Sequence, residues 1–154
     1  ELAVRAAASI ADKSLGENRA VGLTAYGNRL AVIPADRGGR QYLKIMQLLA
    51  AVEGDGSTPL VERLLASLPR LRRGMTAVVI TPSLDRAWVR PLASLRARGI
   101  ATVVIAVRAE HHEPGTDPAL QARALGHALA EYELLNYVIS GDQPLGTQLA
   151  RVTR

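Results

Sequence analysis

The sequence lacks cysteine and phenylalanine, and it is poor in lysine and in aromatic residues of any kind. The absence of cysteine excludes disulfides, thiolate zinc sites and a cysteine nucleophile. With one Trp, four Tyr and no Phe, the core has to be built from Leu, Val, Ile and Ala. No uncharged run approaches the roughly 20 residues of a transmembrane helix, and no signal peptide is visible. We therefore expect a soluble piece of polypeptide.

The length of 154 residues fits one ordinary domain over residues 1–154. The chain starts at Glu1 inside a helical pattern, with no capping residue before it. This start predicts a fragment of a longer protein, truncated at its amino-terminal side.

The net charge of +5 comes from 17 Arg and two Lys set against 14 acidic residues. The densest basic stretch contains Arg70, Arg72 and Arg73, with Arg63 nearby in sequence. We interpret it as a solvated connector and expect no nucleic-acid partner. Anion or nucleic-acid binding through this Arg-rich surface is kept as a third hypothesis for function.

Apolar spacing predicts an alternation of helices and strands along the whole chain. The runs "TAVVIT" and "ATVVIAV" are rich in β-branched residues, as in parallel strands that are covered on both faces. Gly27-Asn28 predicts a two-residue turn of an antiparallel hairpin. The sequence therefore predicts a three-layer, doubly wound α/β fold with a mainly parallel sheet. The helices are expected at 1–15, 40–52, 60–68, 88–98, 118–132 and 144–152, and the strands at 20–26, 29–33, 76–81, 101–107 and 135–140.

Several side chains receive specific places in this scheme. One face of helix 40–52 is expected to bury Tyr42 with Ile45, Met46, Leu49 and Val52, and Leu65 belongs to the apolar stripe of helix 60–68. Asp117 and Asp142 are expected to cap the helices that follow them.

Polar residues cluster in two loops that follow apolar segments, "GDGST" and "TPSLD". "GDGST" lacks the Gly-x-x-x-x-Gly-Lys pattern of a phosphate loop. We expect both loops to form a partner-binding surface, although Asp85 or Ser83 as a helix cap and Asp55 as a turn residue are the simpler interpretations. The expected surface residues are Asp55, Ser57, Thr58, Thr81, Ser83 and Asp85.

The stretch "EHHEPGTD" is the most metal-like part of the sequence. Zinc sites need three or four convergent ligands, and adjacent histidines rarely converge, so we interpret it as an exposed polar loop. A small α/β hydrolase or ligand-binding domain that uses His111 or His112 with Ser57 or Ser83 is the alternative function.

Four stretches together resemble the carboxyl-terminal half of the bacterial family called domain of unknown function fifty-eight. That half resembles a von Willebrand factor A domain. The similarity runs over nearly the whole chain. The stretches are "ELAVRAAASIAD", "RAVGLTAYGNRLAVIPADRGGRQYLKIMQLLAAV", "GDGSTPLVERLLASL" and "AVVITPSLD" continued by "PLASLRARGIATVVIAV".

The resemblance implies a site for a divalent ion that takes an acidic side chain from a partner protein. Its first motif, Asp-x-Ser-x-Ser, would lie before Glu1. Thr58 matches the loop threonine of the family, but Pro82 stands where the family has an acid, and proline offers no side-chain oxygen. We therefore expect neither a metal nor another cofactor in this chain.

The resemblance also places the central strand of the sheet before Glu1. Strands 20–26 and 76–81 would then lack their common neighbour, and unpaired strand edges recruit other chains. We expect these edges either to close on each other or to hold a homodimer.

The resemblance implies a function without catalysis. We expect a protein-protein interaction module of a membrane-attached bacterial protein, with a MoxR-type AAA-plus ATPase as its partner. The parent protein would be held in the inner membrane by upstream segments, with this domain in the cytoplasm.

The expected lack of a metal can be tested by thermal melting. Because an ion that binds the native state must raise the melting temperature, titration with Mg²⁺ or Mn²⁺ should leave it unchanged. A rise that disappears in Thr58→Ala would contradict this expectation.

Overall fold

The computed structural model describes residues 1–27, 29–53, 58–108 and 117–149. The chain divides into two compact units, residues 1–59 and residues 60–154, which we describe separately. Both units combine helices with strands, which confirms the α/β class. None of the described helices has the length and apolarity needed to cross a membrane.

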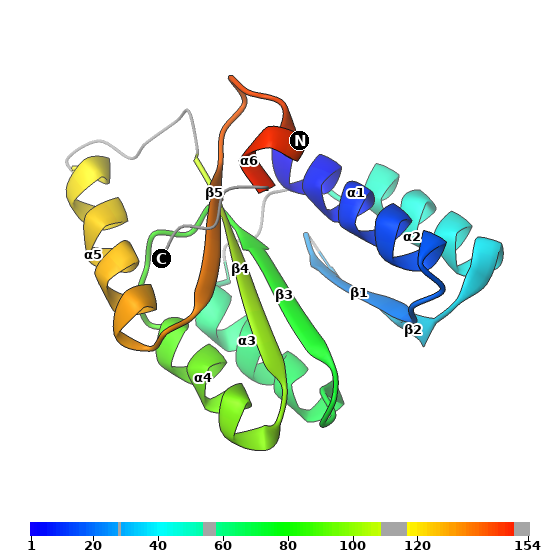
Figure 1. Cartoon of the computed structure of the whole chain (residues 1–154), viewed down its shortest axis with the longest axis horizontal. Helices are drawn as coiled ribbons and strands as arrows, with labels where there is room; N and C mark the ends of the chain where they lie inside the picture. The colour runs from blue at the N-terminus through cyan, green and yellow to red at the C-terminus, as the bar shows by residue number, and fades with distance from the viewer. Residues whose placement is uncertain (28, 54–57, 109–116, 150–154) are drawn as a thin grey trace. The chain divides into compact units, whose positions relative to one another are not determined.

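The first unit is a β-hairpin packed against two helices (Figure 1). Its elements are α1 (Leu2–Gly16), β1 (Val21–Tyr26), β2 (Leu30–Asp36) and α2 (Gly38–Ala51). The strands are antiparallel, as predicted, but Tyr26 pairs with Leu30, so three residues rather than two separate the closing pair. Ala11, Ile45 and Leu49 form the buried core.

A polar contact fastens α2 to the hairpin where the strand register shifts, between Val21 and Leu23. Gln41 is 2% exposed, and its Nε2 donates to the carbonyl oxygens of Val21 at 2.7 Å and Pro34 at 2.8 Å. Gly22 lies in the same irregularity, where a Cβ would come within 2.9 Å of the backbone of β2. The buried amide thus supplies donors to carbonyls at an irregular part of the ladder.

The buried face of α2 differs from the prediction in one position. Ile45 and Leu49 are buried as expected, but Tyr42 is 36% exposed and Gln41 takes the inward position beside it. Apolar spacing alone could not find this, because the hydrogen bonds of Gln41 depend on how β1 and β2 pair.

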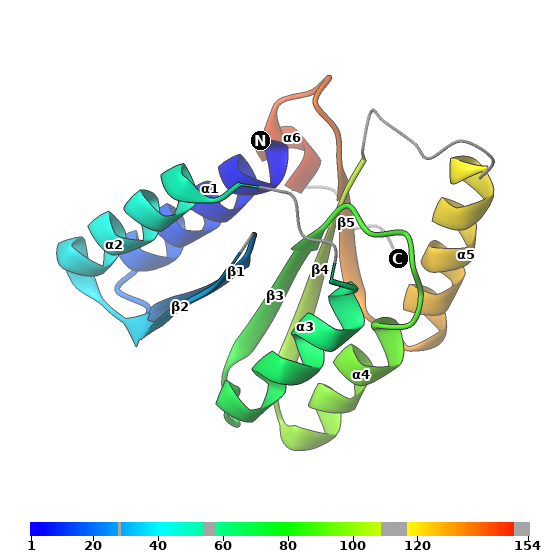
Figure 2. The same cartoon turned by 180° about the vertical axis from the view of Figure 1, so that it is seen from behind.

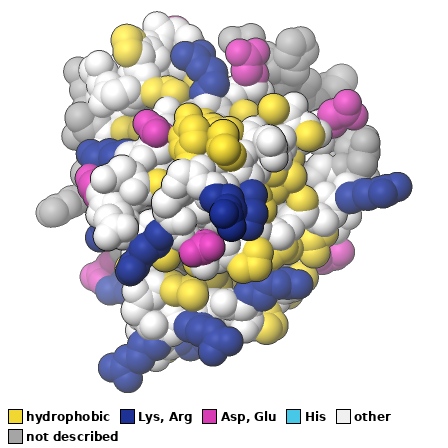
Figure 3. Space-filling view, turned by 90° about the vertical axis from the view of Figure 1, so that its right-hand side faces the viewer, with side chains coloured by type: hydrophobic (Ala, Val, Ile, Leu, Met, Phe, Trp, Pro, Cys, Tyr) yellow, Lys and Arg dark blue, Asp and Glu magenta, His cyan; other side chains and the backbone are white. Residues whose placement is uncertain are grey.

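The second edge of β2 has no strand partner among the described residues. Pro34 lies in this strand, and proline in a sheet is typical of edge strands because it has no N–H to donate. Figure 3 shows hydrophobic and basic side chains side by side on the face where β2 leads into α2. The large hydrophobic residues exposed in this unit are Leu30, Val32, Tyr42 and Leu43.

The second unit is built on a parallel sheet with the order β3-β4-β5 (Figures 1 and 2). This arrangement confirms the parallel pairing that the two β-branched runs predicted. The elements are α3 (Leu60–Ser67), η1 (Leu68–Arg70), β3 (Thr76–Thr81), α4 (Val89–Ala93), η2 (Ser94–Arg98), β4 (Ala101–Val107), α5 (Pro118–Glu131), β5 (Leu135–Ile139) and α6 (Leu145–Leu149).

One face of this sheet is covered by α3, α4 and α5 (Figure 2). Trp88 and Leu92 are fully buried there and belong to one cluster with Val104 of the central strand. Two predicted core positions are not fully covered: Leu65 is 49% exposed and Val78 is 39% exposed. The expectation that β3 is covered on both faces is therefore wrong at Val78, which lies on the face opposite the inward-facing Val79.

Two helices of the second unit end or begin at residues that favour such a boundary. Asp117 accepts hydrogen bonds from the backbone N–H groups of Ala119 and Leu120, with Pro118 in the first turn of α5. Gly99 ends η2 in the left-handed conformation, with φ of 73°. These two signals work because their partners are within three residues of them in sequence.

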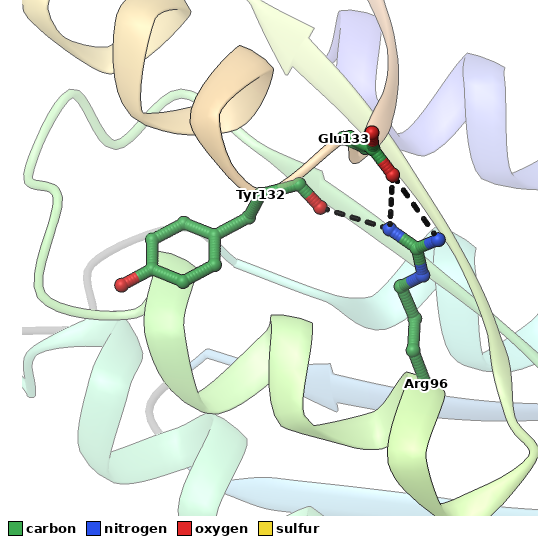
Figure 4. A network of polar contacts seen from close by, with 3 residues as sticks. All are labelled: Arg96, Tyr132 and Glu133. Atoms are coloured by element: carbon green, nitrogen blue, oxygen red, sulfur yellow. Dashed lines mark hydrogen bonds and ion pairs between the residues drawn. The ribbon is translucent and has the colours of Figure 1, made fainter.

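At other turns of the second unit, arginine side chains donate hydrogen bonds to backbone carbonyl oxygens. Arg96 donates to the Tyr132 carbonyl oxygen at 3.0 Å and pairs with Glu133 at 3.4 Å (Figure 4). Glu133 has a φ of 52°, so this contact holds a left-handed residue between α5 and β5. Arg98 donates to the carbonyl oxygens of Leu68 and Leu71. Arg96 and Arg98 therefore stabilise turns, which the amino-acid composition alone does not show.

Two strands match the expectation of unpaired edges. β1 pairs only with β2, and β3 pairs only with β4, within the described part of the chain. Homodimer formation through these edges, the doubly wound arrangement and the single-domain organisation stay predictions.

The contact between α2 and the hairpin predicts a stability difference between two glutamines of the same helix. Gln41→Ala should lower the free energy of unfolding by about 1–3 kcal/mol, because it leaves two carbonyls without their donor. Gln47 is exposed on α2, so Gln47→Ala should change it by no more than about 0.5 kcal/mol. Urea unfolding followed by circular dichroism measures both, and equal effects would contradict the proposed role of Gln41.

Candidate functional site

The carboxyl ends of β3, β4 and β5 meet at one edge of the parallel sheet. Thr81 ends β3, Arg108 follows β4, and Ser140 follows β5. The backbone N–H of Arg108 donates to the Ile139 carbonyl oxygen at 2.8 Å, so β4 and β5 remain joined up to this edge. We call the residues that follow these three strands the carboxyl-edge loops.

The loop after β3 is shaped by three successive contacts between side chains and backbone. Thr81 Oγ1 accepts from the N–H of Ser83 at 3.0 Å, and Ser83 Oγ accepts from the N–H of Asp85 at 3.4 Å. Asp85 Oδ1 then accepts from the N–H of Ala87 at 3.1 Å. Each contact joins residues two apart, which is the pattern of hydroxyl and carboxylate turns. The polar side chains thus fix the path of their own loop.

These turns correct one interpretation of the sequence. Ser83 or Asp85 was expected to cap a helix, but α4 begins at Val89 with Trp88 at its cap position and no side-chain cap bond. Asp85 instead bonds the chain ahead of the helix. Thr81 is 4% exposed, Ser83 is half-buried, and Asp85 is exposed, so Asp85 is the most accessible of these three side chains.

The loop after β5 is held by a buried glutamine. Gln148 of α6 accepts from the Ser140 N–H at 2.6 Å, and its Nε2 donates to the carbonyl oxygens of Ser140 and Gln143 at 2.9 and 2.7 Å. Gln148 is 7% exposed. It therefore ties the loop after β5 to the last helix of the described chain.

Asp142 was expected to cap the last helix, but its described partner is the hydroxyl of Ser140, which donates to Asp142 Oδ1. This hydrogen bond, with one from the aspartate's own backbone N–H, holds the pKa of Asp142 below its ordinary value. Burial acts in the opposite direction, and the positive charge of Arg108 makes the smallest contribution, which lowers the pKa further. Asp142 is thus held in its negatively charged form, near the exposed Arg108.

Arg108 and Asp142 were not among the residues expected at this site. Arg108 has a usable signal, since it directly follows a predicted strand of a parallel sheet. Ser140 and Asp142 are only two residues apart in sequence, but their contact depends on where β5 ends, which the sequence does not determine to the residue.

The structure places the other expected residues differently. Thr58 is exposed and belongs to the first unit. Asp55, Ser57, His111 and His112 lie outside the described residues. Of the expected surface, Thr81, Ser83 and Asp85 are therefore brought together in one loop. In the described ranges, no group of three or more His, Asp or Glu side chains could hold a metal ion.

The sequence profile of one protein family matches residues 1–117 of the 154-residue chain. That family is described as protein of unknown function DUF58. The chain belongs to the DUF58 family. Comparison with curated proteins and with solved structures found no match.

Two hollows in the described part of this DUF58 chain lie in the first unit, with volumes of about 410 and 230 Å³. Thr81, Ser83, Asp85, Arg108 and Asp142 line neither of them. The described carboxyl-edge loops of the DUF58 domain are thus not part of these hollows.

The contact with Ser140 predicts how Asp142 of this DUF58 domain titrates. Ser140→Ala should raise the pKa of Asp142 toward its ordinary value, because the largest contribution to the lowered pKa is lost. Because the folded-state pKa is lowered, the related stability is present above the unfolded pKa and is lost as the pH falls through the folded pKa. Titration of the Asp142 carboxyl carbon by NMR measures the change. Ser9→Ala, which removes a hydroxyl on α1, should leave this pKa unchanged.

Proposed function

We propose that this DUF58 chain is a non-enzymatic protein-binding module, and that its contact surface is formed by the carboxyl-edge loops. The observation that carries the proposal is the series of turns from Thr81 to Ala87. It leaves the carboxylate of Asp85 exposed on a loop whose shape is set before any partner arrives. A surface of this kind loses little conformational entropy on binding.

The chemistry of the edge supports binding more than catalysis. A general acid or base at neutral pH needs a pKa near the operating pH, whereas the pKa of Asp142 is lowered. Thr81 and Ser83 both accept hydrogen bonds from the local backbone. The hydrolase alternative depends on His111 or His112, which lie outside the described residues.

The finer classification is part of the same proposal. The parallel strands, the antiparallel hairpin and the loop that follows "TAVVIT" support a von Willebrand A-like arrangement. In such a domain Pro82 would replace an acid that helps to bind a metal. We propose that this domain binds its partner without a bridging ion, and that a MoxR-type AAA-plus ATPase is that partner. The parent protein would be held at the inner membrane by segments outside this chain, with this domain in the cytoplasm.

The proposal predicts that the charge of Asp85 contributes to binding of the ATPase. Asp85→Asn keeps an oxygen that accepts from the Ala87 N–H but removes the negative charge. We expect about fivefold to tenfold weaker binding of a purified MoxR-type ATPase, with the change mainly in the association rate. Biolayer interferometry at two salt concentrations measures the affinity and the rate.

The matched control is Asp12→Asn. Asp12 is also exposed, and it lies on α1, outside the carboxyl-edge loops. This variant should bind like the unmodified chain. Absence of binding in every nucleotide state of the ATPase, or equal losses in the two variants, would argue against the proposed surface. Binding to the nucleotide-free ATPase that requires added Mg²⁺ or Mn²⁺ would contradict recognition without an ion.

A further inference from the structure

We propose that the open edge of β2, together with the groove between β2 and α2, binds an extended acidic peptide segment of a partner protein. This surface belongs to the first unit and does not include the carboxyl-edge loops. It is therefore a second binding site, independent of the one proposed above.

The edge of β2 is free to accept another strand. β2 pairs with β1 along one side, and no other strand in the described ranges pairs with it. Leu30 and Val32 are 47% and 38% exposed. Unpaired N–H and C=O groups along such an edge are a template for an added peptide strand.

The larger hollow lies at this edge. It measures about 410 Å³, and its lining includes the five consecutive residues Val32 to Asp36. The other lining residues are Gln41 and Lys44 of α2, and no residue of β1 lines the hollow, so it lies on the side of β2 away from β1.

The smaller hollow lies toward the other end of the groove and has a different character. It measures about 230 Å³ and is lined by alternate hairpin residues and by the last turn of α2. Its lining combines apolar side chains with one basic and one acidic residue. A strand added to β2 would send every second side chain toward this face, where an aliphatic residue fits. The lining residues are Gly27, Arg29, Ala31, Leu48, Ala51, Val52 and Glu53.

The charges around the larger hollow favour an acidic occupant. Lys44 lines it, and Arg37 and Arg40 are exposed at the start of α2. α2 itself contains no acidic residue. Asp36, the acidic residue in the lining, accepts a hydrogen bond from the backbone N–H of Arg37.

A second copy of the chain fits this edge less well. Pairing β2 with β2 of another copy would bring Lys44 of both chains to one interface, where like charges oppose association. Pro34 has no N–H that an added strand could use. The remaining ladder is short, which suits a peptide whose side chains also enter the two hollows.

The spacing of the hollows defines a probe. Ala31 lines the smaller hollow and Ala35 the larger one, and four residues of a strand span about 13 Å. In an antiparallel addition, a peptide glutamate should therefore precede a leucine by four positions. The probe is a fluorescein-labelled ten-residue peptide of alternating Thr and Val, with Glu third and Leu seventh.

Fluorescence anisotropy with the full chain measures the binding of this probe. Lys44→Glu should weaken it at least tenfold, whereas Lys13→Glu should change it less than twofold. Lys13 is the matched control, since it is exposed on α1 and is the other lysine of the sequence. A probe with Lys in place of Glu, or with N-methyl groups on the amides that face β2, should also bind at least tenfold more weakly.

Three results would overturn the proposal. The first is that the probe shows no saturable binding up to about 1 mM, the second is that Lys44→Glu and Lys13→Glu weaken its binding equally, and the third is that N-methylation of the probe leaves its affinity unchanged. A dimer in sedimentation analysis that Lys44→Glu dissolves would assign the edge to a second copy instead. Circular dichroism checks that each variant folds, and Lys44→Met replaces Lys44→Glu if the latter does not. Asp85→Asn should bind the probe normally, which separates this site from the carboxyl-edge loops.

Discussion

Parallel pairing of β3, β4 and β5 is the constraint on which the second unit depends. The three strands carry no charged side chain, and their register brings all three carboxyl ends to one edge. Because helices α3, α4 and α5 cover one face, polar groups collect where the strands stop. Thr81, Arg108 and Ser140 share a location for this reason, although they are far apart in sequence.

Polar side chains near a strand end can bind a ligand or form hydrogen bonds with the neighbouring backbone. In the loop after β3 they bond the backbone, since Thr81, Ser83 and Asp85 each accept from an N–H two residues later. The loop after β5 is also held internally, by Gln148 and by the contact between Ser140 and Asp142. Both loops therefore owe their shape to hydrogen bonds within the chain itself.

The features that could be predicted from the sequence have short-range causes. The β-branched runs around Val79 and Val104 predicted parallel strands correctly, and Asp117 with Pro118 predicted the start of α5. The features that were missed depend on contacts between distant residues. Gln41 is buried because the pairing of β1 and β2 leaves carbonyls for it, and Arg96 reaches a turn 37 residues away. In the loop around Ser83 the polar residues are two apart in sequence, but the sequence does not show that they form turns rather than a helix cap.

The position of Pro34 in β2 has a kinetic consequence. Proline has no N–H to donate, so a strand that joins β2 gains fewer backbone hydrogen bonds at Pro34 and should dissociate faster than from an uninterrupted edge. Edge prolines are also one of the features that limit the growth of a sheet by added copies, so the same residue lowers the tendency of β2 to template aggregation.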